Sequence, residues 1–157
     1  MKNLKKILFF AIAVFALVLS SSCSSNDSEE SLPQNDFVKF KYEGKNYSFE
    51  PAILISNSMN IMVSEGIDDT YKKLSLWLPL NAEVGSHPVV YDLSNLTTTY
   101  RITFSFMPEF NNVDVKSGTI NITVNNDKKI EGTFNFSDTK NEKKYEVTDG
   151  SFSISKF

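Results

Sequence analysis

The sequence predicts an all-β protein, an antiparallel β-sandwich or a barrel-like meander of about eight to nine strands. Apolar and polar side chains alternate with a period of two along most of the chain after residue 37, as in strands with one buried face. Turn-forming pairs such as Gly44-Lys45 and Asn126-Asp127 separate the alternating segments. No stretch beyond the first 22 residues shows a helical amphipathic pattern of comparable quality.

The 157-residue chain begins with a predicted signal peptide at residues 1–22. Three lysines within the first six residues form a basic region, and an uninterrupted apolar run follows from Ile7 to Leu19. As a helix this run is about 20 Å long, which is short of the roughly 30 Å hydrocarbon core of a membrane. We therefore expect a targeting signal and exclude it from the fold.

Cys23 is the only cysteine and directly follows three serines, Ser20 to Ser22. This arrangement resembles the bacterial lipobox, in the relaxed form of the Bacteroidota, with Leu19 as the upstream leucine. The resemblance implies diacylglycerol attachment to Cys23, cleavage before it and acylation of the new amino terminus by a fatty acid such as palmitate. Several acyl chains together give a stable membrane anchor. The alternative is an ordinary secretory signal that leaves a free thiol.

Residues 23–36 are predicted to be a lipidated cysteine followed by an acidic, flexible tether. Residues 24–36 carry four acids, no base and no aromatic residue, so they cannot bury enough surface to become ordered. The early acids Asp27, Glu29 and Glu30 resemble the acidic export signal of Bacteroidota surface lipoproteins. The expected location is the outer membrane, with the domain facing the periplasm or the cell surface. A merely solvated acidic linker is the alternative.

Residues 37–157 are predicted to form one all-β domain, which is long enough for a single core. It contains ten of the thirteen phenylalanines, all six tyrosines and the one tryptophan. Its 13 basic and 15 acidic side chains are nearly balanced and form no basic stripe, so a nucleic-acid partner is disfavoured.

The first hairpin is expected at residues 38–50, with a two-residue turn at Gly44-Lys45. The expected register brings four aromatic rings to one face, with Tyr42 opposite Tyr47 and Phe40 opposite Phe49. Pro51 cannot donate to a β-ladder, so this hairpin is expected at a sheet edge or at a bend.

The middle of the chain offers four alternating segments, each with an inward apolar set. Segment 52–63 presents Ile53, Ile55, Met59, Ile61 and Val63. Segment 74–80 presents Leu74, Leu76, Leu78 and Leu80. Segment 85–93 is expected to be a turn followed by a strand with Val89, Tyr91 and Leu93. Segment 97–106 presents Thr98, Tyr100, Ile102, Phe104 and Phe106.

The last third is expected to be a meander. The inward faces of segments 118–125 and 129–136 coincide only if the loop around Asn126-Asp127 has an odd number of residues, three or five. In the final segment, the apolar residues Tyr145 and Val147 have odd numbers, whereas Phe152 and Ile154 have even numbers. One regular strand would therefore point the two pairs to opposite faces. Either Asp149-Gly150 is a tight turn or, as we prefer, it is a β-bulge. The expected bulge register places Tyr145 opposite Phe136, Val147 opposite Phe134, and Phe152 opposite Ile130.

Two C-terminal motifs, I-x-G-T-F-x-F and V-T-D-G-S-F-S-I, and an early G-K-x-Y motif at Gly44, Lys45 and Tyr47 give the chain a family resemblance. It resembles a family of small uncharacterised Bacteroidota lipoproteins. The resemblance covers most of the chain, and it supplies no activity and no site residues.

Residues suited to catalysis are sparse, so we expect no enzyme, no cofactor and no metal site. His87 is the only histidine, and its neighbour Ser86 points to the opposite side of an extended chain. Glu65, Asp68 and Asp69 lack the regular ligand spacing of a calcium loop. No pair of carboxylates is selected as in a glycosidase, and no glycine-rich phosphate loop is present.

Trp77 is the candidate ligand-binding residue. It lies in a leucine-lined strand on the face where polar residues are expected, and exposed aromatic rings stack on sugars or anchor protein partners. The alternative is that both faces of the strand are covered and Trp77 belongs to the core.

The expected function is a non-catalytic binding or cell-envelope interaction module with a glycan or an envelope protein as partner. A lipocalin-like carrier of a small apolar ligand is the second hypothesis, and an interior cavity would distinguish it. A cell-surface hydrolase is the third, and it needs an acid pair or a His87 constellation in a cleft.

Overall fold

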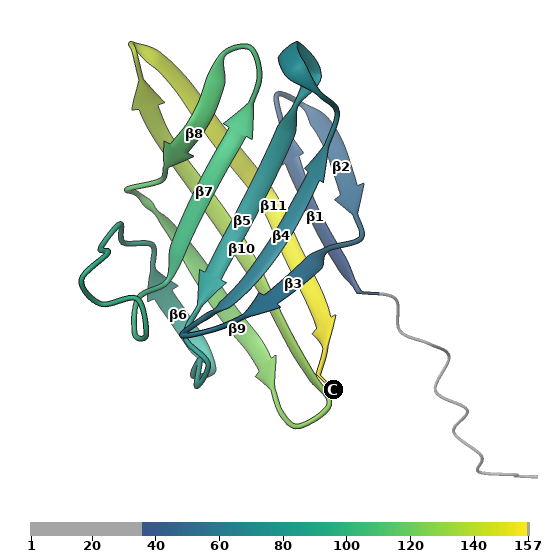
Figure 1. Ribbon diagram of the computed structural model, residues 1–157, viewed down its shortest axis with the longest axis vertical. Helices are drawn as coiled ribbons and strands as arrows, with labels where there is room; N and C mark the ends of the chain where they lie inside the picture. Colours follow the sequence, from purple (N-terminus) through teal and green to yellow (C-terminus); the bar gives the residue numbers. More distant parts are fainter. Residues whose placement is uncertain (1–35, 157) are drawn as a thin grey trace, which may run out of the picture. The chain divides into compact units, whose positions relative to one another are not determined.

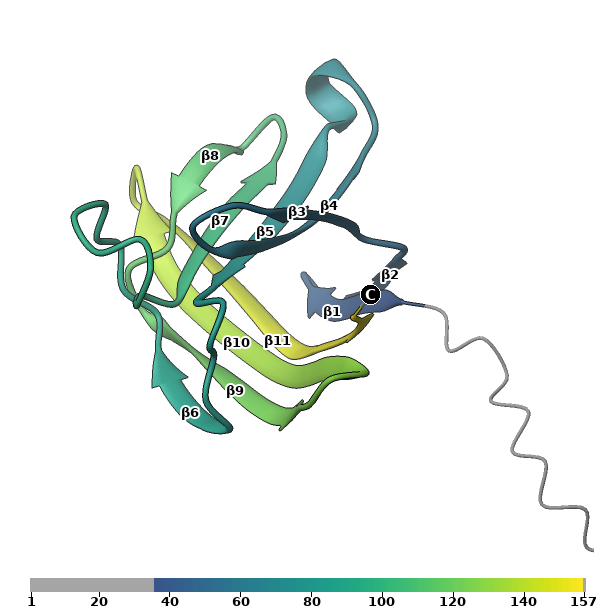
Figure 2. The same ribbon diagram turned by 60° about the horizontal axis from the view of Figure 1, so that its bottom comes forward.

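The protein is a β-sandwich of two antiparallel sheets (Figures 1 and 2). The computed structural model describes residues 36–156. The sheets are separate hydrogen-bonded units, so the predicted all-β sandwich is confirmed and the barrel alternative is not. The six-stranded sheet has the order β2 (Lys45–Phe49), β1 (Phe37–Tyr42), β11 (Lys143–Ser155), β10 (Lys129–Lys140), β9 (Gly118–Asn125) and β6 (Gly85–Pro88). The five-stranded sheet has the order β3 (Ala52–Ile55), β4 (Met59–Glu65), β5 (Lys72–Leu78), β7 (Arg101–Phe106) and β8 (Phe110–Asp114).

The eleven strands of the described residues exceed the eight to nine predicted. Segment 52–63 forms two strands, β3 and β4, joined in a hairpin, and β8 was not predicted. A short 3₁₀ helix, η1 (Asp68–Thr70), joins β4 to β5. No helix within residues 36–156 has the length and apolar character needed to cross a membrane. The predicted signal peptide, Cys23 and residues 24–35 of the predicted tether lie outside the described residues.

The first hairpin has the predicted face and a different register. Its turn is Glu43-Gly44, because both residues have positive φ, 48° and 75°, as a two-residue type I′ turn requires. Phe40 therefore lies opposite Tyr47 rather than Phe49. The rings still share the inner face, and Phe40 stacks on Tyr47 with 5.3 Å between ring centroids. As predicted, the hairpin lies at a sheet edge, and after Pro51 the chain enters the other sheet.

The central segments follow the predicted alternation until they reach prolines or turns. Three of the four leucines of β5 and its flank are buried, whereas Leu80 is exposed because the strand ends at Leu78, before Pro79. Ile55 is also exposed, at the end of edge strand β3.

The prediction of a turn followed by a strand in segment 85–93 was wrong. The strand of this segment is β6, Gly85–Pro88, which occupies the part predicted to be a turn. Val89 is buried, but Tyr91 and Leu93 are exposed in the loop that leads to β7. In segment 97–106, Thr98 is exposed in that same loop, whereas the other four inward residues are buried as predicted.

The β9–β10 hairpin has a three-residue loop at residues 126–128, which confirms the odd-length prediction. The side-chain Oδ1 of Asn126 accepts hydrogen bonds from the backbone N–H groups of Lys128 and Lys129, at 2.9 Å each. A shift in register between Glu131 and Gly132 turns Val124 out of the inward row, so only Ile120 and Ile122 are fully buried from β9.

A β-bulge interrupts β11 at Asp149, as predicted. The register shifts by one residue against both neighbours, β1 and β10, and Asp149 has φ 53°. Asp tolerates this left-handed conformation better than most residues. The register differs by two residues from the predicted one, so Val147 faces Phe136 and Phe152 faces Gly132. The reason is the two-residue turn at Asn141-Glu142, where both φ angles are positive.

The bulge lets both halves of β11 point apolar side chains inward, where Tyr145, Val147, Phe152 and Ile154 are all buried. Glycines make room for two of the rings in this row. A Cβ at Gly132 would lie 2.7 Å from Phe152 Cζ, and one at Gly150 would lie 2.6 Å from Phe134 Cδ2. Between the sheets, aromatic rings from both layers meet around Phe104, whose ring centroid lies 5.4 Å from Phe136 and 5.7 Å from Tyr145.

We expect Asp149→Gly and Asp149→Val to differ in stability, because only glycine adopts a positive φ without a steric cost. Asp149→Gly should change the free energy of unfolding by less than about 0.5 kcal/mol, and Asp149→Val should lower it by about 1–2 kcal/mol. Urea denaturation of the two variants measures the difference. Equal stabilities would show that the bulge does not constrain β11.

Candidate binding site on the five-stranded sheet

The outer face of the five-stranded sheet faces the viewer in Figure 1, and within the described part of the chain no other strand or helix lies over it. The register of β4, β5 and β7 sets which side chains meet there. Asn60 lies opposite Trp77, and Trp77 lies opposite Arg101. Ser75 is two residues before Trp77 on β5 and so shares its face. We call Asn60, Ser75, Trp77 and Arg101 the Trp77 patch.

Each side chain of the Trp77 patch holds a buried polar atom without a hydrogen-bond partner. These atoms are Asn60 Oδ1, Ser75 Oγ, Trp77 Nε1 and Arg101 Nε, and residues 36–156 contain no other buried side-chain nitrogen or oxygen of this kind. An unsatisfied buried polar group costs about 1–3 kcal/mol, so such groups are rare in folded proteins. All four atoms lie in one patch, which makes the Trp77 patch the candidate binding site.

Arg101 is buried without an ion pair. It is 6 % exposed, and within the described residues none of its nitrogens lies within 4.0 Å of a carboxylate oxygen. Its guanidinium carbon lies 4.9 Å from the centre of the Trp77 ring, a cation–π contact. Burial lowers the pKa of Arg101, and electrostatic interactions with Tyr91 and Asp114 act in the opposite direction. The guanidinium remains charged at neutral pH, so it is a buried cation with no bonded anion.

Trp77 is partly buried and lies on the outer side of β5, opposite the buried Leu76 and Leu78. It is neither sealed inside a second layer nor fully exposed, so it falls between the two alternatives drawn from the sequence. Among the described strands, no second sheet packs on the outer face of this strand, where Ser75 and its cross-strand neighbours Asn60 and Arg101 are nonetheless buried.

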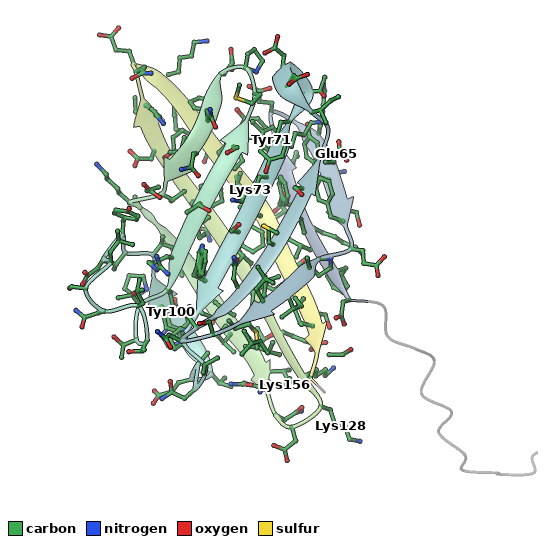
Figure 3. The ribbon with its side chains drawn as sticks, in the orientation of Figure 1. Glu65, Tyr71, Lys73, Tyr100, Lys128 and Lys156 are labelled. Atoms are coloured by element: carbon green, nitrogen blue, oxygen red, sulfur yellow. The ribbon has the colours of Figure 1, made fainter. Side chains whose placement is uncertain are left out.

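The outer face of the three central strands carries positive charge and no negative charge. Its nine outward residues are Asn60, Met62, Ser64, Lys73, Ser75, Trp77, Arg101, Thr103 and Ser105. Figure 3 shows Lys73 on β5 on this face. The nearest acid on the same side of the sheet is Asp114, opposite Thr103 on the edge strand β8. This surface is cationic although residues 37–157 hold more acidic than basic side chains.

His87 packs at a different place and plays a structural part. Its ring stacks on Tyr100 with 4.0 Å between ring centroids, and its Nε2 lies 2.8 Å from the carbonyl oxygen of Glu83. Ser86 alternates with it along β6, where Ser86 faces Asn121 and His87 faces Ile120. The serine and histidine therefore lie on opposite sides of the strand.

The predicted acidic loop also has structural partners. Glu65 forms a 2.8 Å salt bridge with Lys72, and Asp68 and Asp69 are exposed in η1. Among the described residues, no group of three or more histidine, cysteine, aspartate or glutamate side chains converges as a metal site would require.

The sequence pointed to Trp77 and missed its three partners. Arg101 stood in the clearest alternating segment as an ordinary outward residue, and Asn60 and Ser75 are polar residues on outward positions. Only the register of β4, β5 and β7 places them beside Trp77, and register across non-consecutive segments is not readable from a single sequence.

Comparison with known proteins identifies a family and no individual relative. A family model described as "Domain of unknown function (DUF6252)" matches residues 36–154. Neither the comparison with curated proteins nor that with solved structures gave a match.

We expect Arg101→Met to leave the free energy of unfolding unchanged within about 0.5 kcal/mol, or to raise it, because a buried cation without a partner contributes little to stability. The matched control is Ile102→Ala, since Ile102 is the next residue on β7 and fills the core. That variant should lose about 2–5 kcal/mol. Urea denaturation measures both, and a loss above about 2 kcal/mol for Arg101→Met would assign Arg101 a structural role.

Proposed function

We propose that this chain, which belongs to the DUF6252 family of domains of unknown function, is an outer-membrane lipoprotein whose β-sandwich is a non-catalytic binding module. Its ligand occupies the Trp77 patch. The observation that carries the proposal is the gathering of four unpartnered buried polar atoms beside a partly buried tryptophan. Such atoms weaken the free protein and strengthen a complex that satisfies them.

The chemistry of the Trp77 patch supports binding rather than catalysis. Its four side chains are an indole, a guanidinium, an amide and a hydroxyl, and none of them exchanges a proton readily near pH 7. The one histidine is stacked on Tyr100 and bonded to a backbone carbonyl on β6 and its flank, outside the patch. The hydrolase hypothesis therefore gains no support from the arrangement of these residues.

The packing between the sheets supports a surface site over an interior one. Phe104, near the middle of the core, has ring neighbours at 4.8 to 6.4 Å, and they come from both sheets: Tyr42, Phe106, Phe110, Phe136 and Tyr145. Rings in contact on both sides occupy the volume that a carrier of an apolar ligand would keep open.

The membrane anchor rests on the sequence around Cys23. A lipidated cysteine and an acidic tether would hold the binding module outside the membrane, within reach of envelope glycans or envelope proteins. At the start of the domain, the Asp36 carboxylate accepts a 2.8 Å hydrogen bond from the backbone N–H of Ser155. This bond holds Asp36, the first described residue, against the end of β11.

We expect Cys23→Ala to abolish metabolic labelling by palmitate and to release the protein from the membrane fraction, because Cys23 is the only thiol available for acylation. The matched control is Ser22→Ala, which keeps a small residue at the position before Cys23 and should leave labelling unchanged. Labelling that persists in Cys23→Ala would contradict the anchor.

We expect Trp77→Ala to weaken binding to polysaccharide extracted from bacterial cell envelopes by at least about tenfold, since aromatic residues dominate such contacts. Calorimetric titration of the full chain in detergent measures it. Leu93→Ala is the control, because Leu93 is an exposed apolar residue in the loop before β7 and outside the patch. Equal affinities for the two variants would rule out the Trp77 patch as the site.

A further inference from the structure

We infer that the ligand of the Trp77 patch is an acidic saccharide, a sugar chain whose carboxylate is bound by Arg101 and whose ring packs on Trp77. The inference rests on the proposed function and adds the chemical class of the ligand.

The Arg101 guanidinium has no ion pair among the described residues. A buried guanidinium without an ion pair is costly, and a carboxylate is the group that its planar fork of N–H donors fits best. Arg101 Nε has no hydrogen-bond partner in the described structure. Because Nε is buried, a carboxylate reaches it only when neighbouring side chains of the patch move aside, and it would then accept from Nε–H and from a neighbouring N–H at once. The cation–π contact with Trp77 holds the guanidinium plane at the patch.

The atoms of the Trp77 patch that lack partners are a mixture of donors and acceptors. Trp77 Nε1–H can only donate, Asn60 Oδ1 can only accept, and Ser75 Oγ can do both. A ligand that satisfies all three must carry donors and acceptors close together. Each sugar hydroxyl both donates and accepts, and neighbouring ring carbons carry such groups. The side chains of an acidic peptide only accept at neutral pH, so its donors are limited to the backbone. The C–H face of a sugar ring also packs on an indole.

The positive charge of this face continues along β5 beyond the Trp77 patch. Lys73 lies on the same face of β5, four residues before Trp77, which is about 13 Å along the strand. Figure 3 shows it on the open side of the sheet. A chain of acidic sugars laid along β5 would therefore meet a second cation after the first. No acid stands among the nine outward residues of β4, β5 and β7 to repel it.

Asp114 provides an internal check on this inference. Asp114 does not form a salt bridge with Arg101, but its negative charge raises the pKa of Arg101. The carboxylate therefore acts electrostatically on the Trp77 patch. A carboxylate ligand would be repelled by Asp114, and removal of that charge should tighten binding. A neutral ligand would not respond in this way.

The test is calorimetric titration of the full chain in detergent with five kinds of probe. The probes are three oligouronates that differ in ring stereochemistry, the methyl esters of the same oligouronates, a sulfated oligosaccharide, a neutral oligosaccharide and a tetra-aspartate peptide. The variants are Arg101→Gln, Arg101→Lys, Asp114→Asn, Trp77→Ala and, as a control for loss of one positive charge, Lys128→Gln. Lys128 is exposed in the β9–β10 loop at the lower end of the molecule in Figure 3.

At least one oligouronate should bind, and its methyl ester should bind at least about tenfold more weakly. Arg101→Gln should weaken binding by about ten- to hundredfold, the range for a lost hydrogen bond to a charged group. Arg101→Lys should fall between Arg101→Gln and the unchanged chain, because it keeps the charge and loses the fork. Asp114→Asn should bind more tightly, and Lys128→Gln should match the unchanged chain.

Three results would overturn the inference. The first is equal binding of the oligouronate and its ester, or of Arg101→Gln and Lys128→Gln. The second is tighter binding of the sulfated sugar, the neutral sugar or the peptide. If that binding is lost in Trp77→Ala, the proposed binding site stands and only the ligand class is wrong. The third is binding of no probe at all, and the titration with envelope polysaccharide then decides separately on the proposed function.

Discussion

The structure depends on one β-bulge in its longest strand, β11. The bulge exchanges the faces to which odd- and even-numbered residues point. Asp149 adopts a positive φ, and β11 thereby gains one residue against both of its neighbours. Without this bulge, Phe152 and Ile154 would face solvent whenever Tyr145 and Val147 faced the core. With it, all four side chains are buried, and β11 joins β1 to β10 in the middle of the six-stranded sheet. The glycines opposite Phe134 and Phe152 then leave room for the rings, and the space between the sheets is packed with aromatic side chains.

Because side chains fill the interior, we expect a ligand to bind on an outer face of the sandwich. There the five-stranded sheet departs from the usual rule that buried polar groups have partners. Its inner face is saturated with apolar contacts, whereas Asn60, Ser75 and Arg101 are buried on its outer face with atoms that bond to nothing in the described structure. The free energy lost there is available to a ligand that supplies the missing partners. Under the proposed function, stability and binding would be divided between the two faces of the same strands.

Local signals predicted much of the fold, and contacts between distant segments explain what they did not predict. The all-β class, the edge hairpin, the three-residue loop after β9 and the bulge at Asp149 all follow from alternation and parity within short segments. The register of the first hairpin differs from the predicted one because the turn is at Glu43-Gly44 and not at Gly44-Lys45. Glutamate rarely adopts a positive φ, so the sequence did not indicate this turn. The strand β6 ends where Pro88 stands, so Tyr91 and Leu93 remained outside the sheet. Trp77 stood out as an aromatic residue at a polar position. Arg101 and Asn60 had no such signal, because their importance comes from cross-strand neighbours 24 and 17 residues away.

The most direct test of the account is the nuclear magnetic resonance signal of the Trp77 indole N–H. The sequence has one tryptophan, so a ¹⁵N-labelled sample gives one indole resonance, and Trp77 Nε1 has no hydrogen-bond partner in the described structure. If the Trp77 patch is the binding site, titration with an oligouronate should move this resonance to lower field as the indole N–H gains an acceptor, and the Arg101 Nε–H signal should move with it at the same ligand concentration. Binding that leaves both signals in place would contradict the account, because the ligand would then occupy another part of the protein.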